Sequence, residues 1–218
     1  MAARAHNATF ATLLLARGAE ANAQDQAGDT PLHLVVRGLN QLVPQSPVIP
    51  LLVSHRADLG KLNAGGESPL RLDLMRPFYV SPLFLPPGAT NHLFAAARAG
   101  DLKSPEAYLQ LDPSLATIIN PQSRVSPLRF AAEAGQAAVA ERLRQAGASD
   151  PLSAALLGWT NSLAAFLTAQ PDLGATRPGG LPLLHVAASR GQLAAVRLLL
   201  TPELSPNVTD FLDRKSVV

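Results

Sequence analysis

The chain contains no cysteine, and aromatic residues make up only 5% of it. Without cysteine there can be no disulfide bond, no thiol catalysis and no cysteine-ligated zinc, and the composition fits a reducing compartment. No apolar run approaches the roughly 18 residues that cross a bilayer, so we expect no membrane span. Alanine and leucine dominate instead. This composition favours close-packed short helices over a sheet, which would be richer in valine, isoleucine and aromatics.

Charge is sparse as well. Charged residues make up 16% of the chain and the formal net charge is +2, which is too small to indicate a nucleic-acid partner. Hydrophobic residues make up 47% of the 218 residues, so the chain can build a core and is not a disordered tail. No secretory signal pattern is visible. We therefore expect a cytoplasmic protein, with a secreted effector as the alternative.

The stretch from Leu183 to Leu200 predicts two short helices. Apolar residues recur at helical spacing on either side of Gly191, and the glycine breaks the run because it tolerates backbone angles that other residues resist. Two helices this short cannot bury both of their faces alone. They must stack on similar units, which predicts that the chain contains copies of this element.

Copies of the element Ala-Ala-x-x-Gly do occur, each followed by a leucine-rich segment. Their glycines are Gly100, Gly135, Gly158 and Gly191. Two of the three intervals between them are close to the roughly 33-residue period of one class of helical repeat, and the short interval lacks the linking turn. The chain is therefore predicted to be a repeat array.

At this point the sequence resembles ankyrin repeats. The N-terminal half carries the most specific motif of that family, Asp25 to His33 (DQAGDTPLH), with weaker echoes at Ser68-Pro69-Leu70 and Ser126-Pro127-Leu128. The resemblance covers almost the whole chain. It implies an all-α ankyrin-repeat solenoid of stacked helix-turn-helix units, some of them degenerate.

Proline-rich segments divide the predicted array. We expect a first array over residues 1–76, with a partial first repeat, one full repeat interrupted by a proline-rich insertion, and one degenerate repeat. A proline-rich connecting segment over residues 77–89 follows, then a second array over residues 90–203. Residues 204–218 are a tail or the start of a further repeat.

The histidines are expected to have structural roles rather than catalytic or metal-binding ones. His33 and His185 occupy the histidine position of the repeat motif, where the resemblance implies that the imidazole hydrogen-bonds backbone in the turn. His6, His55 and His92 are scattered at no metal-ligand spacing. We expect no metal and no cofactor.

Two further residues could carry catalysis, and for each a structural role is favoured. Ser149 lies in a near miss to a nucleophile elbow, but Pro151 stands where glycine is required, so Ser149 or Asp150 is expected to cap a helix. Asp73 replaces a small residue of the repeat and is either buried beside Arg71 or Arg76 or exposed. We expect no enzyme; a hydrolase centred on Asp73 or Ser149 is a remote third hypothesis.

The resemblance also places the expected binding surface. In ankyrin-like stacks the two residues between Ala-Ala and glycine face the concave side, and the residues flanking the turn glycine lie at its tip. We expect that these residues are not needed to pack neighbouring repeats against each other. The expected partner-binding residues are Gln26, Asp29, Arg37, Arg98, Glu133, Leu156, Leu157, Ser189 and Arg190.

Together these features predict a non-catalytic module or scaffold that binds another protein on a concave face. The alternative is a targeting or autoinhibitory segment of a larger enzyme or secreted effector. Because the array starts at a second helix and stops inside a turn, we expect an excerpt of a longer array or end-to-end self-association. Ser216-Val217-Val218 also matches the C-terminal pattern that PDZ domains bind, a match that is common by chance.

Overall fold

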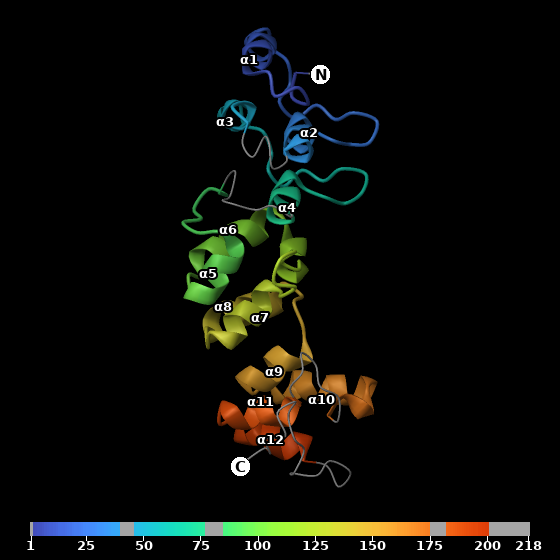
Figure 1. Ribbon diagram of the computed structural model, residues 1–218, viewed down its shortest axis with the longest axis vertical. Coiled ribbons are helices and arrows are strands. Elements are labelled where there is room, and N and C mark those ends of the chain that lie inside the picture. Colours follow the sequence, from blue (N-terminus) through green and yellow to red (C-terminus); the bar gives the residue numbers. More distant parts are fainter. Residues whose placement is uncertain (1, 40–45, 77–84, 175–181, 201–218) are drawn as a thin grey trace. The chain divides into compact units, whose positions relative to one another are not determined.

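The structure is a computed structural model that describes residues 2–39, 46–76, 85–174 and 182–200. Within these ranges every regular element is a helix and no strand occurs, so the all-α prediction is confirmed (Figure 1). Contacts group the chain into two compact units. Unit 1 comprises residues 1–93 and 103–125, and unit 2 comprises residues 94–102 and 126–218. The predicted boundary at residues 77–89 stays a prediction.

Unit 1 is built from short helices joined by turns. Its helices are α1 (Ala8–Ala16), α2 (Pro31–Gly38), α3 (Val48–Ser54), α4 (Pro69–Leu74), α6 (Lys103–Leu111) and the 3-10 helix η1 (Pro113–Thr117). Helix α3 packs against α1 and α2, and α2 packs against α4. After the proline-rich insertion the repeat resumes with α3, which begins at Val48.

Unit 2 repeats one arrangement three times. Its helices are α5 (Leu93–Ala99, except its first residue), α7 (Pro127–Glu133), α8 (Ala137–Gln145), α9 (Pro151–Leu157), α10 (Thr160–Ala169), η2 (Pro171–Gly174), α11 (Leu183–Ser189) and α12 (Leu193–Leu199). The pairs α7–α8, α9–α10 and α11–α12 each pack together. The first helices α7, α9 and α11 also pack successively against one another, so the predicted stacking of helix pairs is present.

Four of the first helices begin in the same way. Thr30, Ser68, Ser126 and Asp150 are N-cap residues, and each is followed by proline at the first helical position. Each cap side chain accepts a hydrogen bond from the backbone N–H three residues later, and such a cap contributes about 1 kcal/mol. In α11 the cap position holds Pro182, which makes no side-chain cap. The prediction that Ser149 or Asp150 caps a helix is confirmed for Asp150.

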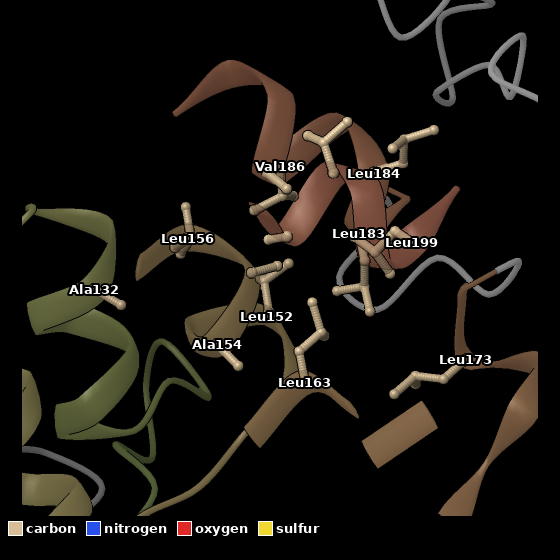
Figure 2. Packing of buried hydrophobic residues seen from close by; sticks show 14 residues of the cluster. Ala132, Leu152, Ala154, Leu156, Leu163, Leu173, Leu183, Leu184, Val186 and Leu199 are labelled. Atoms are coloured by element: carbon tan, nitrogen blue, oxygen red, sulfur yellow. The ribbon is translucent and has the colours of Figure 1, made fainter. Parts of the chain in front are cut away.

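The core of unit 2 lies between its stacked helices. Figure 2 shows Leu152, Leu163 and Leu183 converging between α9, α10 and α11. The Ala-Ala pairs of α7 and α9 are fully buried, and small side chains there let neighbouring helices approach closely. Gly100, Gly135, Gly158 and Gly191 have positive φ and end the first helices, which is why the sequence element requires glycine at that place.

One residue with the sequence pattern of a cap does not cap its helix. Ser104 precedes a proline, as the four caps above do, but α6 already begins at Lys103 and Ser104 lies inside it. Ser104 is buried, and its Oγ accepts hydrogen bonds from the backbone N–H groups of Thr90 (2.9 Å) and Asn91 (3.0 Å). The hydroxyl therefore holds the preceding turn rather than its own helix.

Candidate functional site

His33 connects two successive repeats of unit 1. Its imidazole is fully buried, and Nδ1 accepts a hydrogen bond from the Thr30 backbone N–H at 3.0 Å. A backbone N–H can only donate, so the proton is on Nε2, which donates to the Glu67 carbonyl of the next turn at 2.9 Å. The predicted structural role of this histidine is confirmed. His185 is half-buried and its role stays a prediction.

The turn tips of unit 1 are tied to each other by polar contacts. Asn63 donates from its side chain to Asp29 Oδ1 at 2.7 Å, and the Ala64 N–H donates to the Ala27 carbonyl at 3.0 Å. Arg37 Nη2 lies 2.6 Å from Glu67 Oε2 and 3.5 Å from Asp29 Oδ1. These contacts join residues of one repeat to residues of the next.

The three expected binding residues of unit 1 therefore differ in exposure and in their contacts. Gln26 is exposed at the tip of its turn. Arg37 is exposed but already forms an ion pair with Glu67 of the next repeat. Asp29 is buried, with only 7% of its surface exposed, and it accepts from Asn63. The expectation that these residues are free of packing duties is wrong for Asp29 and Arg37, because their charges are used to join the repeats.

The expected residues of unit 2 lie at the C-terminal ends of its first helices. Arg98, Glu133, Ser189 and Arg190 are exposed, and we refer to these four as the helix-end row. The expectation that Leu156 is exposed is wrong, because it is 8% exposed and belongs to the core cluster. Leu157 is partly buried against the same cluster. An apolar side chain at this place packs inward, whereas a charged one stays in water.

Long side chains cross from one repeat to an earlier helix end in this unit. Gln136 Nε2 donates to the Arg98 carbonyl at 3.4 Å, and Gln192 Nε2 donates to the Leu156 carbonyl at 3.3 Å. Arg190 Nη2 donates to the Glu133 carbonyl at 2.6 Å. The last carbonyls of a helix have no partner inside the helix, so each of these donors satisfies one of them. The expectation that Arg190 has no packing duty is wrong for this reason.

The two glutamines were missed by the sequence reasoning, although a signal existed. Each follows a turn glycine, in Gly135-Gln136 and Gly191-Gln192. After Gly158 the corresponding residue is Trp159, whose ring lies under the Arg144 guanidinium, 5.5 Å from Arg144 Cζ. Comparing the residue after each glycine would have found the pair.

The two candidate catalytic residues, Asp73 and Ser149, have different surroundings. Asp73 is buried, with 1% of its surface exposed, and accepts from Arg76 Nε at 2.9 Å. This decides between the expected alternatives in favour of a buried ion pair with Arg76. Ser149 is exposed before the capped start of α9. Among the described residues no group of three or more His, Asp or Glu side chains could hold a metal ion.

Burial lowers the pKa of the His92 imidazole to about 4, because the charged form would lose its hydration. His92 lies edge-on to the Tyr108 ring, with centroids 6.5 Å apart. In unit 2 the half-buried Glu141 has its pKa lowered by the side-chain hydrogen bond from Arg144. These shifts belong to packing and to a surface ion pair.

Some expectations lie outside the described residues. They concern the proline-rich segment around Phe78 and Tyr79, and the C-terminal residues that include Ser216-Val217-Val218. For the ranges that the structure does describe, no helix combines the length and the apolar character needed to pass through a bilayer.

No protein-family model matches the chain, and no curated protein matches it either. Among solved structures, the crystal structure of the human ASB11 ankyrin repeat domain is similar to it, with a TM-score of 0.40 and 14% sequence identity. The similarity covers 99% of this chain and 87% of that chain. The fold described above is defined by the chain's own helices and contacts.

Proposed function

We propose that the protein is a non-catalytic interaction module that binds another protein on the concave face of its repeat stack. The proposed contact surface is the helix-end row of unit 2, Arg98, Glu133, Ser189 and Arg190. At the end of α9 the corresponding residues are the buried Leu156 and the partly buried Leu157. In unit 1, taken by itself, the exposed Gln26 is the remaining candidate contact.

The observation that carries the proposal is the regular placement of exposed side chains on buried supports. Arg98, Glu133 and Ser189 each directly follow an Ala-Ala pair, and the helices that carry them are joined by Gln136, Gln192 and Arg190. Such a surface is ordered before binding, so a partner would meet side chains whose backbone is already fixed. This is what a recognition surface without covalent chemistry requires.

The test compares a row variant with a control on outer helices. The row variant is Arg98→Ala with Glu133→Ala, and the control is Arg197→Ala with Asn161→Ala, which are exposed positions of α12 and α10. Proteins captured from the native cell are quantified by mass spectrometry, and a thermal melt of each variant is recorded. We expect a defined set of captured proteins to be lost only from the row variant, with similar melts. Equal capture by both variants would contradict the proposal.

Self-association is a second candidate, and helix α1 favours it. Phe10, Leu13 and Leu14 are 45%, 49% and 39% exposed, and Ala11 is the buried residue of this helix. Helix α1 carries no charged residue, so two copies can meet there without repulsion between like charges. We expect the weight-average mass to rise with concentration, and Leu13→Gln to abolish that rise. A concentration-independent monomer mass would contradict this candidate.

The proposal also includes the setting in which the module works. We expect a cytoplasmic protein, or a targeting or autoinhibitory segment of a larger enzyme or secreted effector. We expect no nucleic-acid partner, because Glu133 and Glu141 are interspersed with the arginines of unit 2. Few aromatic side chains are available to stack on bases.

A further inference from the structure

We infer that the helix-end row binds an acidic segment of its partner, in which two carboxylates face Arg98 and Arg190. This inference rests on the proposed function and adds the chemistry of the partner. It follows from where the Arg190 guanidinium lies and from how the charges around it are already used.

Arg190 is the C-cap residue of α11, and its side chain reaches the end of α7. Helix α9 packs against both α7 and α11, and Arg190 Nη2 nevertheless bonds the Glu133 carbonyl at 2.6 Å. The same guanidinium lies near Gly135, since Nη1 is 4.0 Å from the place of a Cβ there. One of its five donors is used by the carbonyl and the residue is exposed, so a ligand would meet a guanidinium held in place with donors to spare.

The neighbouring arginine is at the end of the adjacent helix. Helices α5 and α7 are in contact through Phe94 and Phe130, whose rings meet edge to face with centroids 5.9 Å apart. Arg98 is exposed at the end of α5, and no described residue engages its guanidinium in an ion pair or hydrogen bond. Arg98 thus lies at the end of α5, and the Arg190 guanidinium reaches the end of the neighbouring helix α7.

The nearby carboxylates are already engaged. Glu133 Oε1 accepts from Arg129 Nε at 2.7 Å, four residues earlier in α7. Asp101 follows the turn after α5, is half-buried and already takes part in an interaction. Arg98, Arg129 and Arg190 therefore leave a positive excess at this end of the stack, and a carboxylate of the partner would complete it.

The placement of the two arginines at neighbouring helix ends defines the ligand further. In an extended chain every second side chain points to the same face, and such side chains lie roughly 7 Å apart, so two carboxylates with one residue between them can face both arginines. A nucleic acid is the less favoured ligand, because the exposed Glu133 carboxylate at the end of α7 would oppose a continuous phosphate backbone. The expected ligand is an acidic peptide segment in extended conformation.

The experiment is an NMR titration of the full chain with a short Gly/Ser peptide carrying two glutamates separated by one residue. A matched peptide with two glutamines is the control, and the arginine Nε–H signals are followed. We expect saturable shifts at Arg98 and Arg190 with the glutamate peptide only, weakening with added salt. Arg98→Gln and Arg190→Gln should each weaken binding roughly fivefold, and Arg197→Gln should leave it unchanged.

Arg98→Gln keeps the test independent of folding, because only the backbone carbonyl of Arg98 takes part in a contact between repeats. The inference would be overturned if the glutamate peptide caused no shifts or if the glutamine peptide caused equal shifts. It would also be overturned if a protein carrying both Arg98→Gln and Arg190→Gln bound the glutamate peptide as well as the wild type. Tighter binding of a single-stranded oligonucleotide at the same arginines would also overturn it. Loss of captured proteins from the Arg98→Ala, Glu133→Ala variant without any peptide binding would refute the acidic ligand and leave the proposed function intact.

Discussion

The two units join their repeats in different ways. In unit 1 the joining contacts lie at the turns before the helices, where His33 bonds the Glu67 carbonyl and Asn63 bonds Asp29. In unit 2 they lie at the other end of the helices, where Gln136, Gln192 and Arg190 bond backbone carbonyls. The repeat motif of unit 1 is the most complete one in the sequence, and the motifs of unit 2 have lost most of its polar residues.

The difference decides which charged side chains remain exposed in each unit. The charged side chains at the turns of unit 1 are largely used between repeats, as Asp29 and Arg37 illustrate. In unit 2 two of the three joining donors are uncharged glutamines, so Arg98 can stay exposed without a partner in the described part of the chain. Joining repeats through neutral donors therefore leaves charged side chains of unit 2 exposed.

The largest expected loss of stability comes from breaking the turn contacts of unit 1. His33→Ala removes a fully buried side chain and its bonds to Thr30 and Glu67, so we expect a loss of about 3 kcal/mol in the free energy of unfolding. His185→Ala, at the corresponding place in unit 2, should cost on the order of 1 kcal/mol because that side chain is half-buried. Urea denaturation of both variants measures this, and equal losses would remove the distinction between the units.

Acid is expected to destabilise unit 1 through His92. Its pKa is about 4 in the folded chain and 6.5 as the ordinary value, so the unfolded chain binds more protons between these pH values. Stability should therefore be fully present above pH 6.5 and should fall as the pH approaches 4, by about 3 kcal/mol when complete.

The measurement is a series of urea titrations at different pH values. His92→Gln should flatten the pH dependence, whereas His55→Gln, at an exposed histidine, should leave it as in the wild type. An unaltered slope in the His92 variant would show that other groups cause the acid sensitivity.

Two glycines at corresponding turns of unit 1 test how much the contact between the turns contributes to stability. Gly28 and Gly66 both have positive φ, so alanine costs about 1 kcal/mol at either place. At Gly28 an added Cβ would lie 2.7 Å from the backbone nitrogen of Ala64, whereas at Gly66 it meets nothing within 4 Å. We expect Gly28→Ala to cost at least about 1 kcal/mol more, because the two turns must separate. Equal thermal melts would mean that the turn contacts contribute little.

The smallest expected effect concerns the helix ends of unit 2. Gln192→Ala removes one neutral hydrogen bond, to the partly buried Leu156 carbonyl, so we expect a loss below about 1 kcal/mol. Hydrogen exchange of the α9 and α11 amides should report it, with α7 amides as the internal control. A loss as large as that of His33→Ala would place the main joining contacts at the helix ends.

Much of the fold was predictable because short sequence patterns determine where its helices begin, end and pack. The N-cap residues followed by proline, the glycines with positive φ and the buried alanine pairs all have direct sequence patterns. The candidate site was predicted less well. Nothing local indicates that Asp29 faces Asn63, or that Arg190 reaches the end of α7 past α9, because these contacts join residues from different repeats. Leu156 was wrongly expected on the binding surface because of its position in the repeat motif. Its apolar side chain instead packs into the core.

Site-specific photo-crosslinking tests the central claim most directly. A photoreactive amino acid is placed at Ser189 of the helix-end row and, as a matched control, at Arg197 of α12, both of which are exposed. After irradiation in the native cell, crosslinked proteins are identified by mass spectrometry. The account predicts discrete crosslinked partners from Ser189 whose yield falls when Arg98→Gln is added, and none of them from Arg197. The same partners from Arg197, or none from Ser189, would contradict it.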